Sequence, residues 1–220
     1  MIIEKGKYKN KNSRGISIMI KYRRTIDNIN EYQCGELPLN AQKLEAPTTM
    51  EEMIKKSTPI AIVLLLVMFW AMFFKTYVSK SMVVFLPAVV VGMVFGFLLL
   101  IVHEWLHAIV YPKQAVVTIG KLKGKVLFVA LASFPLKRSR FITMSLLPFL
   151  LGVIPLILFL LSSPDNKILN GILFGMTGIG MISPCPDMYN VFLVLKQAKK
   201  NDKIMFYGDD MYKISQHQKL

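Results

Sequence analysis

Four long apolar stretches between residues 59 and 195 constrain the fold of this chain more than any other feature. They cover residues 59–74, 82–111, 141–161 and 169–195. A helix needs about 20 apolar residues to cross the hydrocarbon core of a bilayer, and all but the first stretch reach that length. Backbone inside a bilayer must satisfy its own hydrogen bonds, which a helix does. We therefore expect an α-helical polytopic membrane protein with about four transmembrane helices.

Composition supports a membrane protein and raises one competing class. Hydrophobic residues make up 54% of the 220-residue chain, which is too apolar for an ordinary soluble domain. The net charge of +14 is also typical of nucleic-acid-binding proteins. The basic residues lie mostly outside the apolar stretches, however, and no nucleic-acid-binding motif is present. We expect them to flank the spans and contact anionic lipid, with no nucleic acid as partner.

The distribution of Lys and Arg predicts the orientation of the spans. The segment before residue 58 holds 11 of them, the 112–140 connection holds seven, and the segment after residue 195 holds six. The 75–81 connection holds two, and the 162–168 connection holds one. Because basic segments stay in the cytoplasm, this alternation predicts a multi-pass protein of the cell membrane with both termini cytoplasmic.

Three regions follow from this layout: a polar, basic cytoplasmic tail at 1–57, a transmembrane domain at 58–200, and a cytoplasmic C-terminal tail at 201–220. Within the transmembrane domain, the 112–140 connection contains two β-prone runs separated by a Gly- and Lys-containing turn. It therefore predicts a small β-hairpin at the cytoplasmic face. An edge strand of this hairpin would pair with an extended substrate, or the hairpin would simply face lipid, and the sequence leaves both open.

A His-Glu-x-x-His motif lies inside the second stretch, at His103, Glu104 and His107. Residues four apart lie on one face of a helix, so both imidazoles can bind one metal ion. Glu104 is placed where zinc peptidases keep the carboxylate that moves protons. The alternative is a buried structural cluster in which a histidine bonds Glu104. Ionisable groups inside a span are costly and by default functional, so the motif predicts a catalytic zinc site.

A catalytic zinc site needs a third protein ligand, and Asp187 is the best candidate. Between residues 58 and 195 the other acidic residues are Glu104 and Asp165. Asp165 falls in the short connection that is expected on the opposite side of the membrane. Cys185 remains a competitor because a thiolate also binds zinc.

The sequence around Asp187 predicts a broken helix. Pro184 and Pro186 each remove a backbone donor, and a restarted helix would hold Asp187 in its first turn. His103 and Asp187 each lie eight residues before the inner end of their stretch, so their depths agree. Asn190 should share the face of Asp187, where it would bind the substrate or oxyanion, or bond a neighbouring helix.

These features together resemble the site-2 protease group of intramembrane metalloproteases and, more closely, the putative zincin peptidase family of small bacterial membrane proteins. The resemblance covers roughly residues 55–215. It implies that the two motif histidines and Asp187 bind zinc, with Glu104 as acid and base. Met188 follows Asp187, where site-2 proteases usually have glycine.

The leading hypothesis is a zinc-dependent intramembrane endopeptidase that acts on membrane or membrane-proximal proteins and peptides near the cytoplasmic leaflet. The alternative is a non-proteolytic, metal-binding membrane scaffold or regulator. A scaffold would need the histidines but not Glu104, so the retained carboxylate favours the enzyme. An ion transporter would need a polar path, and the first and third stretches contain no acidic residue or histidine.

Overall fold

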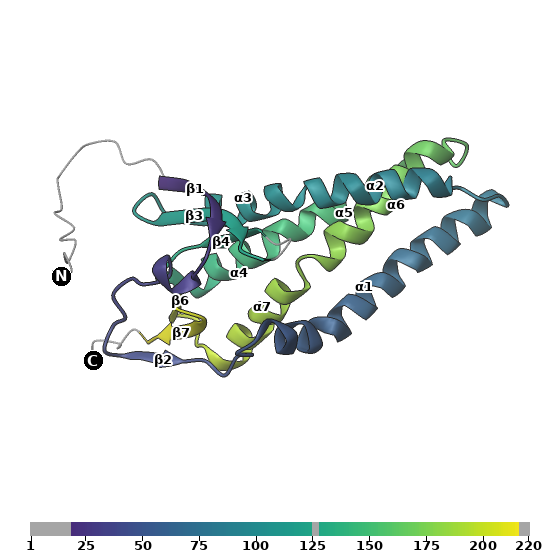
Figure 1. The fold of residues 1–220 in the computed structure, drawn as a ribbon. Helices are drawn as coiled ribbons and strands as arrows, with labels where there is room; N and C mark the ends of the chain where they lie inside the picture. The colour runs from purple at the N-terminus through teal and green to yellow at the C-terminus, as the bar shows by residue number, and fades with distance from the viewer. Residues whose placement is uncertain (1–18, 125–127, 216–220) are drawn as a thin grey trace.

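The computed structural model describes residues 19–124 and 128–215 of the chain. Four helical segments run along the same general direction (Figure 1). Each is long and apolar enough to cross a membrane, and their number agrees with the number of spans that the sequence predicts. Their bounds are Met50–Ser79, Leu86–Val110, Arg138–Leu161 and Lys167–Gln197.

Most of these spans are divided by a short break. The first is one helix, α1 (Met50–Ser79), whereas the second consists of α2 (Leu86–Leu98) and α3 (Leu100–Val110). The third consists of α4 (Arg138–Leu146), a 3₁₀ turn (Leu147–Phe149) and α5 (Leu150–Leu161). The fourth consists of α6 (Lys167–Ile182) and α7 (Cys185–Gln197). The predicted break at Pro184 is therefore confirmed, since this residue separates α6 from α7.

The first span is longer than the apolar stretch at 59–74 that predicted it. Thr49 caps the helix, because its side-chain oxygen accepts a hydrogen bond from the Glu52 backbone N–H at 3.2 Å. From this cap α1 continues for 30 residues, or about 45 Å. It therefore extends beyond a hydrocarbon core of about 30 Å or tilts within it.

Helices α2 and α6 approach closely because glycine lies at their contact. A Cβ added to Gly175 would lie 2.1 Å from the Val89 carbonyl oxygen, and one added to Gly92 would lie 2.1 Å from that of Ile172. Neither distance is compatible with a side chain. This is the packing that small residues permit between membrane helices.

A buried lysine joins α1 to α5 and α6 at the end of the bundle opposite the sheets. The Lys75 ammonium donates hydrogen bonds to the Phe159 and Ser162 carbonyl oxygens, the Ser162 hydroxyl and the Asn170 side-chain oxygen. Lys75 and Asn170 are both buried. Each donor proton of the cation thus has an oxygen partner, which offsets the cost of burying it.

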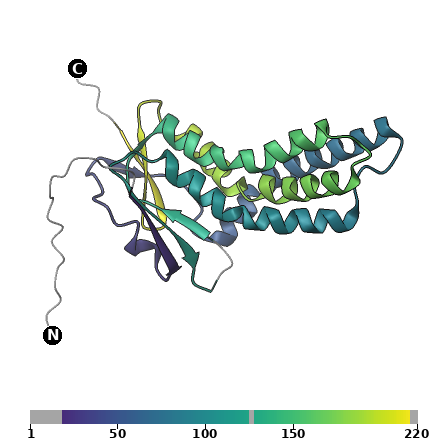
Figure 2. The ribbon, with the colours of Figure 1, turned by 90° about the horizontal axis from the view of Figure 1, so that it is seen from above.

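Two small sheets lie at one end of the helices, beside both ends of the described chain (Figures 1 and 2). The first has the order β1-β3-β4 and the second the order β2-β7-β6-β5. Their strands are β1 (Met19–Ile26), β2 (Ala41–Lys43), β3 (Val116–Leu122), β4 (Phe128–Leu131), β5 (Leu136–Lys137), β6 (Lys203–Tyr207) and β7 (Asp210–Ile214).

Strands β3 and β4 form the predicted antiparallel hairpin, with Ile119 opposite Ala130. Residues 126 and 127, the first two of the second predicted run (126–130), lie outside the described residues. The other strands were not predicted. Strand β1 pairs with β3 in parallel, and β6 and β7 form a second hairpin within the segment expected as a C-terminal tail. The fold is thus four apolar helical spans with a two-sheet layer at one end.

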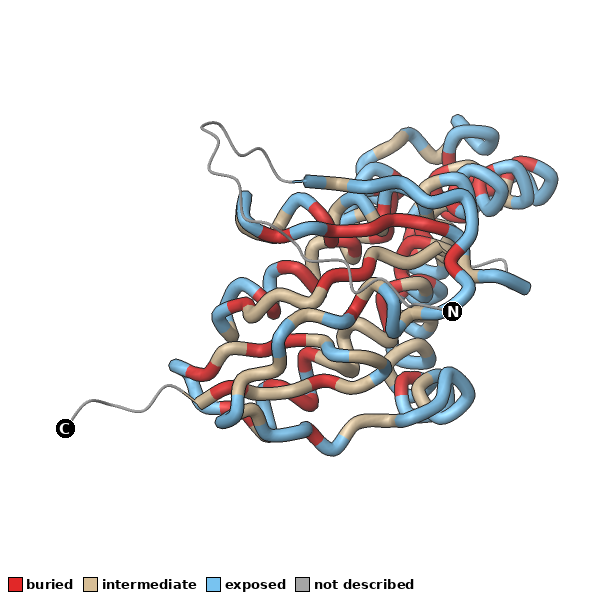
Figure 3. Tube along the Cα trace, turned by 60° about the vertical axis from the view of Figure 1, so that its left-hand side comes forward, coloured by how far each residue is buried: buried red, intermediate tan, exposed pale blue. Residues whose placement is uncertain are grey.

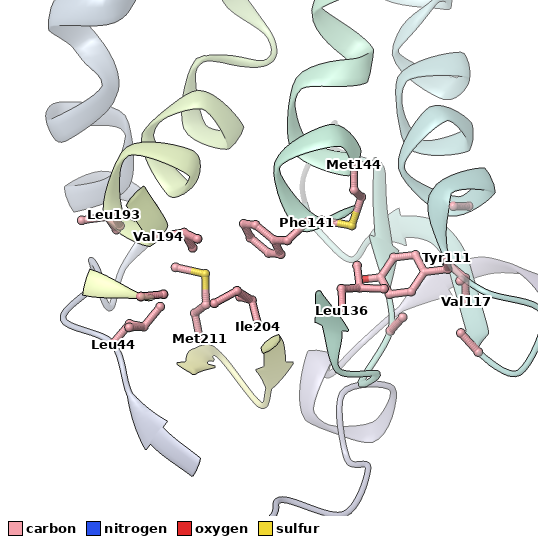
Figure 4. Close-up of a cluster of buried hydrophobic side chains, with 14 of the residues drawn as sticks. Leu44, Tyr111, Val117, Leu136, Phe141, Met144, Leu193, Val194, Ile204 and Met211 are labelled. Carbon is pink, nitrogen blue, oxygen red and sulfur yellow. The ribbon is translucent and has the colours of Figure 1, made fainter. Parts of the chain in front are cut away.

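An apolar cluster attaches both sheets to the ends of α3, α4 and α7 (Figure 4). Buried residues gather at this junction, whereas the helix surfaces carry many exposed residues (Figure 3). Each large side chain that is fully buried contributes about 1.5–3 kcal/mol to stability. The cluster therefore fixes the strands relative to the helices that carry the motif. Its labelled members are Leu44, Tyr111, Val117, Leu136, Phe141, Met144, Leu193, Val194, Ile204 and Met211.

Candidate metal centre

Helix α3 places the two histidines of the motif one above the other. Their ring centroids lie 4.8 Å apart, and the Nε2 atoms of His103 and His107 are separated by 3.1 Å. Both side chains are buried. One helix turn thus brings two imidazole nitrogens to one point inside the protein, as the spacing of the motif predicted.

The other ring nitrogens have partners that fix the rings. His107 Nδ1 lies 2.9 Å from the Met144 carbonyl oxygen, which can only accept a hydrogen bond. This nitrogen must therefore carry a proton in the neutral ring, and the Nε2 lone pair is left for a metal. His103 Nδ1 lies 3.4 Å from the Ser183 hydroxyl. Met144 belongs to α4 and Ser183 to the break between α6 and α7, so packing of the bundle orients the rings.

The break between α6 and α7 brings Asp187 to the same point. Helix α7 begins at Cys185, and Asp187 lies in its first turn. Its Oδ2 atom lies 3.3 Å from His103 Nε2 and 3.5 Å from His107 Nε2. The three side chains thus form a group whose ligand atoms all lie within 4.8 Å of one another.

Cys185, the competing ligand, does not join this group. Its thiol is buried and donates to the Met181 carbonyl oxygen at 3.4 Å, within its own helical segment. The donor set that the structure brings together is therefore two imidazoles and one carboxylate.

This donor set fits a tetrahedral zinc ion. Zinc–nitrogen and zinc–oxygen bonds of about 2.0–2.2 Å at tetrahedral angles place neighbouring ligand atoms roughly 3.3–3.5 Å apart. The three distances between the Nε2 atoms and Asp187 Oδ2 are 3.1, 3.3 and 3.5 Å. Three protein ligands leave a fourth position for water, which is the arrangement of catalytic rather than structural zinc sites.

Glu104 and Asn190 lie beside the group rather than in it. Glu104 Oε1 is 3.9 Å from His103 Nε2, and its side chain is 13% exposed. Both Glu104 and Asn190 line the same cavity as the three candidate ligands. The structure therefore brings all five candidate site residues to one cavity.

The cavity has a volume of about 330 Å³, within the range of ligand sites. Strand β4 contributes all four of its residues, Phe128–Leu131, to the lining. Strand β4 thus lies next to the candidate ligands. Tyr111 also lines the cavity, and burial raises the pKa of its phenol, so the side chain stays protonated.

Several lining residues had no signal in the sequence. They come from the segment before α1, the first turn of α1, and the β6–β7 hairpin. These segments are distant in the chain from the motif and carry no motif of their own. The residues are Ile29, Gln33, Met50, Met53, Phe206 and Asp209.

Residues 96–202 match a family model described as "Putative zincin peptidase". No curated protein and no solved structure matches the chain. The matched segment contains α3, β3, β4 and α7, and with them the three candidate ligands, Glu104 and Asn190. Over this segment, just under half of the chain, the sequence is similar to the putative zincin peptidase family.

Proposed function

We propose that this protein is a zinc-dependent intramembrane endopeptidase that hydrolyses peptide bonds of membrane or membrane-proximal substrates near the cytoplasmic leaflet. The spacing of His103, His107 and Asp187 carries the proposal, because it suits tetrahedral zinc with one position open. Zinc held there would polarise the scissile carbonyl and lower the pKa of a water molecule.

The residues around the candidate ligands would supply the rest of the chemistry. Glu104 accepts the proton of the attacking water and returns it to the leaving amine. Asn190 offers an amide that can donate a hydrogen bond to the substrate backbone or to the developing oxyanion. The site lies about 10–15 Å from the sheet-proximal ends of its spans, since His103 is seven residues before Val110 and Asp187 ten before Gln197.

The edge of β4 suits an extended substrate. Side chains alternate between the two faces of a strand, so a cavity that met one face would contact every second residue. Here the four consecutive residues Phe128–Leu131 line the cavity, which therefore meets β4 along its edge. The sheet order β1-β3-β4 also places β4 at an edge. This supports pairing of a substrate strand with β4 over a hairpin that only faces lipid.

The exposed strand β1 suits anionic lipid as a partner. Lys21, Arg23 and Arg24 are exposed on it. The neighbouring Tyr22 ring lies 6.2 Å from that of Trp105, which is part of α3 and also exposed. Tyr and Trp favour the interface between hydrocarbon and headgroups, and basic residues beside them attract anionic headgroups.

Metal removal tests the proposal directly. Purified protein is expected to contain one zinc ion per chain and to cleave a model transmembrane substrate. A chelator should abolish cleavage, and added zinc should restore it. The His107→Ala variant should contain little zinc and stay inactive, because one of three ligands is missing. Equal metal content in wild type and His107→Ala, measured by mass spectrometry of the metal, would contradict the proposed site.

Cysteine labelling tests the orientation that we propose, with both termini cytoplasmic. In a Cys34→Ser background, a cysteine at Lys123 should resist a membrane-impermeant maleimide in intact cells and react after permeabilisation. Lys123 is exposed in the β3–β4 turn, whereas the remaining native Cys185 is buried. A cysteine at Asp165, in the connection between α5 and α6, is the matched control and should react in intact cells. The reverse pattern would overturn the orientation.

A further inference from the structure

The cavity beside the candidate metal centre is acidic, although the chain as a whole is basic. The chain contains 27 Lys and Arg residues against 13 Asp and Glu. Three carboxylates nevertheless line the cavity, from Glu104, Asp187 and Asp209, and no described lining residue is Lys or Arg. Metal binding and proton transfer account for Glu104 and Asp187. Asp209 has no part in either.

The turn that carries Asp209 is fixed against the segment before α1. The Gly208 backbone N–H donates to the Gln33 carbonyl oxygen at 2.7 Å. Gly208 has a φ of +58°, and a Cβ there would lie 2.7 Å from the Asn30 side-chain oxygen. Gln33 is buried and itself lines the cavity. These contacts place Asp209 at the rim as a defined part of the cavity.

The neighbouring carboxylate, Asp210, is engaged elsewhere. It forms an ion pair with Lys43 at 2.7 Å, and it does not line the cavity. Within residues 19–124 and 128–215, Asp209 has no ion-pair partner. Its charge is therefore available to a ligand in the cavity.

We propose that Asp209 is a specificity-determining residue that selects substrates with a Lys or Arg close to the scissile bond. This inference rests on the proposed function and names its substrate class: apolar segments that adjoin a basic residue. Met50, Met53 and Phe128 line the cavity with apolar side chains that suit the apolar segment. Asp209 provides the negative charge that suits the basic residue. Cytoplasmic ends of membrane spans have this composition, because Lys and Arg accumulate there.

A hydrogen bond just beyond β4 connects this strand to the hairpin that carries Asp209. The Ser133 hydroxyl, just beyond β4, donates to the Phe206 carbonyl oxygen at 2.8 Å. Phe206 and Asp209 belong to the same hairpin and line the same cavity. The hairpin that carries Asp209 is therefore attached next to the C-terminal end of β4.

Peptides that differ at a single position test this inference. One series would carry Lys, Gln or Glu at successive positions around the cleavage site, with kcat/KM measured for each. Wild type should prefer Lys over Gln by about fivefold at one position, the upper range for a partly exposed ion pair. Asp209→Asn should remove the preference, and Asp209→Lys should favour Glu at the same position. Asp210→Asn is the matched control and should keep the wild-type preference.

The outcomes separate the inference from the function on which it rests. Cleavage with a Lys preference that persists in Asp209→Asn would overturn the inference and leave the endopeptidase in place. The same holds if Asp210→Asn changes the preference as much as Asp209→Asn does. Failure of wild type to cleave any peptide or model membrane substrate would overturn both. A preference that weakens as salt is added would support the ion pair.

Discussion

The Glu104→Gln variant is expected to lose peptide-bond cleavage by roughly 10²–10⁴-fold while it keeps the zinc content of wild type. Glu104 lies beside the three candidate ligands, with its Oε1 atom 3.9 Å from His103 Nε2. The amide of glutamine has the same shape but cannot take a proton from water. Cleavage rates and metal content, measured on the same preparation, test both halves of this expectation.

This variant also separates the enzyme from the scaffold. A non-proteolytic scaffold depends on the two histidines and the fold, and neither changes when Glu104 becomes Gln. Cells that carry Glu104→Gln should therefore resemble a deletion strain if the protein is a protease. If they resemble wild type while His107→Ala cells do not, the scaffold hypothesis is correct. Asp165→Asn, in the connection far from the cavity, is the control for loss of a carboxylate.

The four long apolar helical segments could be predicted because a bilayer permits so few structures. A long apolar stretch must be helical there, whatever its neighbours are. The break before Asp187 was also predictable, since proline acts through local backbone geometry at Pro184 and Pro186. At the start of α1, polar residues continue the helix beyond the apolar stretch. Thr49 signals that start through capping rather than hydropathy.

The meeting of His103, His107 and Asp187 could also be predicted, although Asp187 lies 80 residues from the motif. Spacing placed the histidines on one face, and depth placed the carboxylate at the same level. Ligand atoms within 4.8 Å agree with that interpretation. Depth is informative here because residues on different membrane helices can be compared by a single quantity, their expected distance from the membrane surface. A soluble protein offers no such common scale.

The sheets and the cavity rim could not be predicted, because they depend on pairing between distant segments. Strand β1 pairs with β3 across nearly one hundred residues, as Met19 opposite Val116 shows. Its Lys and Arg residues are exposed, so it lacks the alternation by which a half-buried strand is recognised. The β6–β7 hairpin contributes Asp209 to the cavity in the same way, through tertiary contacts alone.

Asp187→Ala is expected to weaken zinc binding strongly, because it removes a ligand. Loss of a residue that only hydrogen-bonds a ligand already weakens metal binding by roughly 10–100-fold, and the loss of Asp187 should exceed that. Its Oδ2 atom lies 3.3 and 3.5 Å from the two Nε2 atoms, which makes it the only anionic member of the group. Asp187→Asn should be nearly as harmful, because a neutral amide leaves the charge of a divalent cation uncompensated inside a membrane span. Competition with a chelator of known affinity measures both variants.

Cys185→Ser is the matched control for Asp187, two residues away in the same helix. The thiol points to the Met181 carbonyl oxygen, and a serine hydroxyl can make the same hydrogen bond. Zinc affinity should therefore remain at the wild-type level in Cys185→Ser and fall in both Asp187 variants. The opposite pattern would make the thiolate the third ligand and would require α7 to rotate on metal binding. Because Asp187 already stands at tetrahedral spacing from both imidazoles, no such movement is needed for the carboxylate to bind.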